Sequence, residues 1–286
     1  MTGTPLDLTP FGALLKGIGL IYWMLAALGL WWALRGSSPW RTKLLRAIPV
    51  VLLFGFFPGR LAWERHQSRS RLDASMALFH DRCKTAGERI TRTVENVDGI
   101  LLTNVRPKAE PLDLSAPNWP DAALPHESRE DWYIRNFLFW EHHEDKRSAR
   151  GYLNEQPSDL PGYRFVDVKS EDGKVNRYRL KKSERAELSR ELVNGPHARY
   201  AVSFVNMIDP ADRDKWVAGT KVLITDTATT EVIAEHTWFS IEPGQGNTAG
   251  FRTPWAFALT CPKQEGWGGG TTRFFVDQVL KPKREE

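Results

Sequence analysis

The feature that most constrains this chain is an uncharged, apolar run near its beginning. Between Lys16 and Arg35 lie 18 consecutive uncharged residues, 17–34. At about 1.5 Å per residue, a helix of this length crosses a hydrocarbon core of about 30 Å if Lys16 extends its side chain to the headgroups. We therefore predict a transmembrane helix over about residues 14–34.

A second apolar run follows, but it is shorter. Residues 47–59 form a run of 13 uncharged residues that includes two prolines. Extending it to 44–63 gives 20 residues, with Arg46 and Arg60 close enough to the ends to reach the headgroups. We predict a second crossing over about residues 44–63, so that 1–63 form a transmembrane helical hairpin. The alternative is a re-entrant or interfacial segment, which would leave the rest of the chain on the other side of the membrane.

The formal net charge of +4 is concentrated in this apolar segment. Up to Trp63 the chain has six basic residues and one acidic residue, a balance of +5. The other 33 basic and 34 acidic residues, from Glu64 onward, give a balance of −1. A domain with so little net charge has no electrostatic basis for binding DNA or RNA, so we expect a lipid bilayer but no nucleic acid as partner.

Basic residues near the ends of a span indicate which loop stays in the cytoplasm. The loop between the two runs carries four basic residues and no acidic one: Arg35, Arg41, Lys43 and Arg46. Four more follow the second run, on the opposite side: Arg60, Arg65, Arg69 and Arg71. Because the first helix usually determines orientation, we place the loop in the cytoplasm. The prediction is an integral protein of a bacterial inner membrane with a periplasmic domain formed by residues 64–286.

The two cysteines of the chain, Cys83 and Cys261, lie far apart in the sequence. Neither belongs to a CxxC motif or to a Cys/His cluster with metal-ligand spacing, and we expect no cofactor. A disulfide between them would suit an oxidising compartment and agrees with a domain outside the cytoplasm. Two buried free thiols are the alternative.

Residues 64–286 are predicted to form an α+β domain with a mainly antiparallel sheet and two or three helices. Helices are expected at 69–91, 128–146 and 183–195. Strands are expected at 163–169, 174–180, 200–208, 221–226, 231–241, 255–261 and 273–280, with hairpin turns at 171–173 and 227–230. A further hairpin is expected around Asp98-Gly99. Five prolines between residues 106 and 125 predict an extended connector that wraps across the domain.

Histidines in the sequence do not form a recognised metal or catalytic site. The adjacent His142 and His143 point about 100° apart on a helix and cannot easily share one metal. His80 and Cys83 would supply only two ligands on one helix face. We therefore interpret the first pair as a solvated helix end and the second pair as packing.

Two further patterns resemble known sites only superficially. The glycine stretches 243–246 and 266–272 lack the Lys-Ser/Thr of a phosphate-binding loop, although such loops often lie beside binding surfaces. His236 and Ser240, four residues apart on one strand, would lie about 13 Å from each other, too far for the hydrogen bond of a catalytic triad. No catalytic residue is therefore predicted.

Interface residues are the remaining candidates. Trp119 in the proline connector and Trp267 in the glycine stretch are candidate anchors, because tryptophan is enriched at the centre of protein interfaces. Four basic residues form a candidate contact surface for an acidic partner or an anionic lipid headgroup: Arg177, Arg179, Lys181 and Lys182. The alternative for these four is a solvated sheet edge, where lysine discourages further strand pairing.

The sequence thus predicts a membrane-anchored, non-enzymatic protein-binding module, either an envelope accessory protein or a neutralising protein of the immunity type. The alternative is a membrane-tethered enzyme, most simply a hydrolase, whose site is assembled from residues distant in sequence. A membrane-perturbing or channel-forming protein is disfavoured, because neither apolar run carries a polar stripe.

Overall fold

The computed structural model describes most of the chain in two compact units, Met1–Ser70 and Arg71–Glu286. The described residues are 10–36, 39–110, 112–138, 162–170, 172–181, 187–195, 197–264 and 269–283. They contain five α-helices and a mixed sheet that is mostly antiparallel, so the predicted α+β class is confirmed. The expected boundary between the membrane anchor and the folded domain, after residue 63, falls within one long helix. The division after Ser70 falls within the same helix.

The first unit contains helix α1 (Pro10–Leu34) and the first part of helix α2 (Trp40–Cys83). Both helices are long and apolar enough to cross a bilayer, and no residue in the apolar window of α2 is buried. Pro49 and Pro58 lie inside α2 without ending it. Other apolar helices have the same length and composition. The membrane hairpin therefore stays a prediction.

Helices α1 and α2 pack against each other within the first unit. The hydroxyl of Tyr22 donates a 2.5 Å hydrogen bond to the carbonyl oxygen of Phe54, and the two rings lie 5.3 Å apart in an edge-to-face contact. Gly29 allows a close approach, because a Cβ at that position would lie 3.1 Å from a methyl group of Val50. Small residues at such contacts are typical of helices that associate in lipid.

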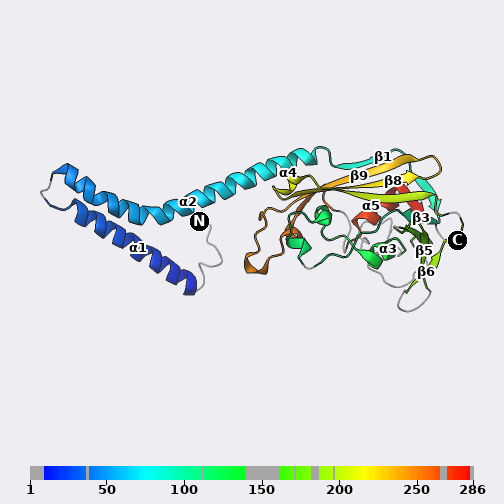
Figure 1. The fold of residues 1–286 in the computed structure, drawn as a ribbon, viewed down its shortest axis with the longest axis horizontal. Helices are drawn as coiled ribbons and strands as arrows, with labels where there is room; N and C mark the ends of the chain where they lie inside the picture. Colours follow the sequence, from blue (N-terminus) through cyan, green and yellow to red (C-terminus); the bar gives the residue numbers. More distant parts are fainter. Residues whose placement is uncertain are drawn as a thin grey trace. The chain divides into compact units, whose positions relative to one another are not determined.

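The second unit is built on a nine-stranded sheet with the order β1-β9-β8-β7-β3-β4-β5-β6, in which β10 also pairs with β9 (Figure 1). The strands are β1 (Gly87–Ile90), β3 (Gly99–Leu102), β4 (Phe165–Lys169), β5 (Val175–Leu180), β6 (Leu188–Leu192), β7 (Tyr200–Met207), β8 (Val217–Asp226), β9 (Glu231–Ile241) and β10 (Leu259–Cys261). Strand β3 is parallel to both of its neighbours, β4 and β7, and the other pairs are antiparallel. The predicted hairpins β4–β5 and β8–β9 are confirmed.

The hairpin expected around Asp98-Gly99 was wrong. Strand β2 (Val94–Val97) pairs in parallel with β11 (Leu280–Pro282) in a separate two-stranded sheet, while β3 enters the large sheet. Gly99 has a packing role instead, because a Cβ there would lie 2.5 Å from the ring of Phe165. The glycine therefore marks a close approach rather than a turn.

Helices α3 (Glu130–Leu138) and α5 (Thr271–Val279) lie on the same face of the sheet (Figure 1). Their apolar residues join those of β3, β7, β8 and β9 in the largest core cluster, which includes Phe137, Trp238 and Phe275. The short helix α4 (Pro210–Arg213) follows β7. The predicted helix over 128–146 is thus confirmed as far as Leu138, and His142 and His143 lie outside the described residues.

Three further predicted elements differ from the structure. Residues 273–279 lie in α5 instead of a strand, because Phe275, Val276 and Val279 are buried with helical spacing. Residues 188–192, expected to be helical, form β6, whose backbone pairs with β5 along its length. Only the last three residues of the expected strand at 255–261 are extended, since Pro254–Phe257 form a 3₁₀ turn. Long-range pairing and burial override the local preferences in each case.

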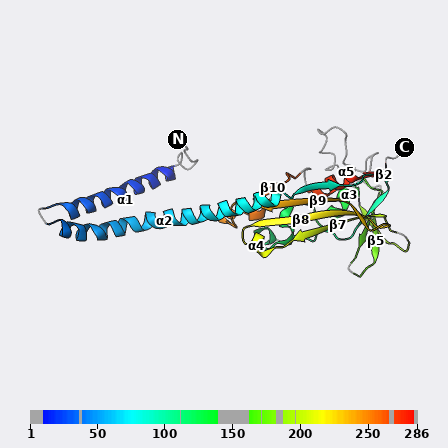
Figure 2. The same cartoon turned by 90° about the horizontal axis from the view of Figure 1, so that it is seen from above.

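The end of α2 belongs to the second unit. Phe79 packs in a core cluster with Val217, Phe239 and Ile241, and the Arg82 guanidinium binds both carboxylate oxygens of Asp212 at 3.0 and 2.9 Å. The helix expected at 69–91 is therefore the continuation of α2, which ends at Cys83 before β1 begins (Figure 2).

Candidate functional site

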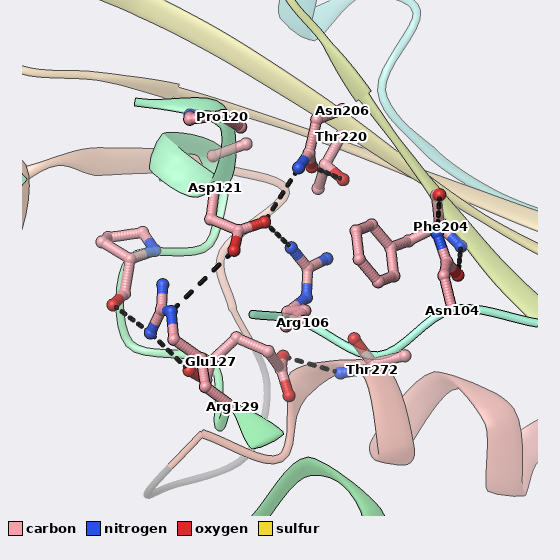
Figure 3. Close-up of polar contacts among 12 residues, drawn as sticks. Asn104, Arg106, Pro120, Asp121, Glu127, Arg129, Phe204, Asn206, Thr220 and Thr272 are labelled. Carbon is pink, nitrogen blue, oxygen red and sulfur yellow. Dashed lines mark hydrogen bonds and ion pairs between the residues drawn. The ribbon is translucent and has the colours of Figure 1, made fainter. Parts of the chain in front are cut away.

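One polar part of the interior is a charge cluster formed by Arg106, Asp121, Glu127 and Arg129 (Figure 3). All four residues come from the proline-rich connector and the turn before α3. The connector does wrap across the domain, since Trp119, Ala122 and Ala123 pack with residues of β8 and the 3₁₀ turn Pro254–Phe257. Wrapping buries two of the charged side chains that the connector carries, Arg106 and Asp121, whereas Lys108 and Glu110 stay exposed.

Asp121 is the centre of the charge cluster. Its Oδ1 accepts hydrogen bonds from Arg106 Nη1 at 2.7 Å and from Asn206 Nδ2 at 2.8 Å, and its Oδ2 lies 3.9 Å from Arg129 Nε. Thr220 continues the network by donating to Asn206 Oδ1 at 2.8 Å. Strands β7 and β8 therefore contribute two uncharged residues that orient the Asp121 carboxylate.

The two arginines of the charge cluster also lie over aromatic rings. The guanidinium carbon of Arg106 is 4.3 Å from the ring centroid of Phe204, and that of Arg129 is 4.8 Å from the ring of Trp119. Among the described residues, Nε and Nη2 of both arginines have no hydrogen-bond partner. Cation–π contacts partly replace these hydrogen bonds, because the ring quadrupole attracts a desolvated cation.

Glu127 is the group of the charge cluster best suited to proton transfer. Its Oε2 accepts a 3.0 Å hydrogen bond from the backbone N–H of Thr272 in the first turn of α5. Burial raises the pKa of Glu127 to about 7, although Arg106, Thr272 and Arg129 oppose the shift. A carboxyl group with this pKa can donate or accept a proton near neutral pH. It is also enclosed, since Glu127 is only 3% exposed.

A second candidate is an open cleft between the β1–β9 edge and α5, here called the aromatic cleft. Its volume is about 390 Å³. The residues that line it are Gly87, Glu88, His236, Trp238, Pro262, Lys263, Thr271, Phe274, Phe275 and Gln278. The cleft is of the size and apolar character found in sites for small groups, with a few polar residues that can fix orientation.

Stacked rings line the aromatic cleft. His236 lies almost parallel to Trp238, with ring centroids 3.6 Å apart, and Phe275 meets His236 edge-on at 5.1 Å. Burial lowers the pKa of His236 to about 4, so its ring is neutral at neutral pH. Glu88 Oε2 lies 3.9 Å from His236 Nδ1, and Lys263 is exposed. The cleft therefore combines largely buried aromatic rings, of which Trp238 and Phe275 are each only 2% exposed, with one acidic and one basic residue.

The predicted cysteine pair is brought together. Cys83 at the end of α2 forms a disulfide with Cys261 in β10, with Cα atoms 5.7 Å apart. The bond closes a sequence separation of 178 residues. It fastens the last turn of α2 to the edge of the large sheet.

The predicted interface residues are dispersed. Trp119 is only 4% exposed and forms part of the core, so it is not a surface anchor in this structure. Trp267 and Lys182 lie outside the described residues. Arg177 is bound by both carboxylate oxygens of Asp167 at 2.7 and 2.8 Å.

The other two basic candidates are also paired. Arg179 pairs with Glu191, and Lys181 lies 3.5 Å from Glu187. Acidic partners thus offset the basic surface in the described part of the hairpin. This arrangement corresponds to the alternative of a solvated sheet edge.

Ser240 and His236, considered above as members of a catalytic triad, do not hydrogen-bond to each other in the described residues. Ser240 is buried and donates its hydroxyl to the carbonyl oxygen of Ala123 at 2.6 Å, away from His236. Across the described ranges, no three His, Cys, Asp or Glu side chains are grouped as metal ligands. Sequence reasoning missed the charge cluster, whose one signal was the presence of charged residues within an otherwise apolar, proline-rich connector.

Comparison with models of known protein families, with curated protein sequences and with solved structures finds no match. The function must therefore be inferred from the geometry of the charge cluster, the aromatic cleft and the two apolar helices.

Proposed function

We propose that this chain is a membrane-anchored protein whose folded domain lies outside the cytoplasm and binds another protein. The observation that carries the binding function is the contrast between the two candidate sites. The aromatic cleft is open and combines stacked rings with Glu88 and Lys263, whereas the charge cluster is sealed and its groups bind one another. An open apolar cleft with polar residues at its edge suits recognition of an inserted side chain.

The membrane anchor is supported by exposed apolar side chains on α1 and on the first part of α2. Trp32 is 71% exposed, Leu53 is 72% exposed and Phe56 is 70% exposed. Large apolar side chains in such numbers are stable where lipid, not water, surrounds the helix. We propose that both helices span the membrane as a hairpin.

The placement outside the cytoplasm is supported by the disulfide, because such bonds persist in oxidising compartments. The test uses intact cells and a thiol reagent that does not cross the inner membrane. Cys83 and Cys261 should be labelled only after treatment with a reductant that also stays outside. Labelling that requires lysis but no reduction would place the domain in the cytoplasm.

Binding through the aromatic cleft can be tested by site-specific photo-crosslinking in the native membrane. A photoreactive residue at Gln278, which lines the cleft, should give a discrete adduct with a partner protein, and Lys263→Glu should reduce it. A photoreactive residue at Val232, exposed on β9 outside the cleft lining, is the matched control. Equal adducts from Gln278 and Val232 would contradict binding at the cleft.

A membrane-tethered hydrolase is the second candidate, favoured by Glu127. A carboxyl group with a pKa of about 7 beside Arg106 is a plausible general acid or base. The full-length protein would be assayed with chromogenic esters, glycosides and phosphate esters, together with its Glu127→Gln variant. Hydrolysis that is lost in the variant would support the enzyme and reject a purely structural role for the charge cluster.

A further inference from the structure

The segment between β9 and β10, residues 242–258, presents a fully exposed aromatic side chain. Phe251 is 103% exposed, and its backbone is in the left-handed region with φ 61°. The preceding residue, Gly250, is also left-handed, with φ 70°. A large apolar side chain held out at a strained loop position lies outside any core, and such residues often mark binding surfaces.

The base of this loop is fixed. Glu242 is fully buried, and its carboxylate accepts hydrogen bonds from the backbone N–H groups of Gly244 at 2.8 Å and Gly246 at 2.7 Å. The Arg252 guanidinium also pairs with Glu242 and lies 4.8 Å from the ring centroid of Phe257. The carboxylate thus organises both sides of the loop, which projects from the sheet (Figure 1).

Other exposed apolar residues share the same end of the sheet. Phe257 is 58% exposed, Leu259 is 50% exposed and Ile208, directly after β7, is 52% exposed. Strand register places these positions together, since β7 and β8 meet at Met207 and Gly219, while β10 and β9 meet at Leu259 and Ile241. The apolar surface is therefore a property of one end of the domain.

That end is also where α2 joins the second unit. The Ser75 hydroxyl of α2 donates a 3.0 Å hydrogen bond to the carbonyl oxygen of Arg71, and its oxygen lies 3.4 Å from Gln245 Oε1 at the base of the loop. Ser75 follows Trp63, the end of the second apolar run, by twelve residues of the same helix. At 1.5 Å per residue, these twelve residues correspond to roughly 18 Å of helix.

We propose that the 242–258 loop contacts the phospholipid surface of the membrane that anchors the chain, with the Phe251 ring inserted among the headgroups. Aromatic rings prefer the interfacial layer of a bilayer. A loop that is already ordered loses little conformational entropy when it inserts such a ring. The inference rests on the proposed anchor. It deepens that anchor by giving the domain a second, loop-mediated contact with the bilayer.

The experiment uses the full-length protein in phospholipid nanodiscs. The two native cysteines form a disulfide, so Phe251→Cys can be labelled alone with an environment-sensitive fluorophore. The label at position 251 should shift to shorter wavelength, be quenched by lipids with a spin label near the headgroup, and lose quenching by aqueous iodide. Val232→Cys, at the opposite end of β9, should remain fully quenched by iodide.

Leu28→Cys in α1 separates the two proposals. Quenching of its label by spin-labelled acyl chains reports the anchor alone, so a failure there rejects the anchor and the loop contact together. If Leu28 is in lipid but the 251 label responds to iodide as the 232 label does, the loop contact is wrong. Protection of position 251 that appears only at high protein density, without lipid quenching, would assign the loop to a protein contact and overturn the proposal.

Discussion

Thr272 and Glu127 are joined by a 3.0 Å hydrogen bond between the backbone N–H of Thr272 and the carboxylate of Glu127, across 145 residues of sequence. The bond satisfies one of the N–H groups that the first turn of a helix leaves without a partner. It also fixes the end of the connector to α5. Glu127 therefore has a structural role as a helix cap whether or not it transfers protons.

The pKa of Glu127 makes the stability of the domain depend on pH. Burial raises it from 4.5 to about 7, so folding favours the protonated form. Glu127 therefore contributes about 3 kcal/mol to the free energy of unfolding below about pH 4.5, and this contribution is lost as the pH rises through 7. Chemical unfolding of wild-type protein and Glu127→Gln in detergent at pH 5 and pH 8 should show a smaller pH dependence in the variant. Equal dependence in both proteins would contradict the assignment.

His236 should make the stability of the domain depend on pH in the opposite direction. Burial lowers its pKa from 6.5 to about 4, so the folded state favours the neutral ring. Its contribution is present above pH 6.5 and is lost as the pH falls toward 4. His236→Phe keeps the ring stacked on Trp238 and should reduce the loss of stability between pH 6.5 and 4.5. His80→Phe, at an exposed position of α2, is the control and should leave that loss unchanged.

Removal of the disulfide should destabilise the second unit strongly. A bond that closes a loop of this length restricts the unfolded chain. This restriction stabilises the folded state by about 3–5 kcal/mol. The double variant Cys83→Ser/Cys261→Ser should unfold at correspondingly lower denaturant concentration, and reduced wild-type protein should match it. A double variant as stable as oxidised wild type would show that packing around Phe79 alone holds the end of α2.

Gly269 should tolerate no side chain. It has φ +89°, and a Cβ would lie 2.6 Å from the carbonyl oxygen of His126 and the nitrogen of Ser128. Gly173 has a similar φ of +81° but nothing within 4 Å, so it isolates the cost of the backbone conformation. We expect Gly173→Ala to lower the free energy of unfolding by about 1 kcal/mol and Gly269→Ala to lower it by about 3 kcal/mol. Only Gly269→Ala adds a steric clash. Thermal unfolding followed by circular dichroism compares the two, and equal costs would refute the clash.

Local sequence signals predicted the elements whose formation depends on neighbouring residues. The strands on either side of the two predicted turns, β4 and β5 and then β8 and β9, pair as expected, and the run of uncharged residues at 17–34 forms a helix. The α+β class followed from the same signals. These features need no information about distant parts of the chain.

The errors arose where a distant partner determines the structure. The segment of β6 contains Leu188 and Leu192 with helical spacing, but β5 supplies a full set of strand partners. The aromatic and β-branched residues of α5 favour a strand locally, whereas the core places Phe275 and Val279 on one helix face. Candidate sites were missed for the same reason, because Arg106, Asp121 and Thr272 meet only after the connector has wrapped across the sheet.

The pairing of β1 with β9 has a consequence for biosynthesis. Gly87 of β1 lies opposite Thr237 of β9, about 150 residues later in the chain. A ribosome that adds about 5–20 residues per second needs about 8–30 s to make that interval, during which β1 has no partner. If the first helices insert into the membrane as we propose, the chain would hold an unfinished sheet at the membrane for this time. Its yield in the cell should therefore depend on the holding chaperones of the compartment that receives the domain.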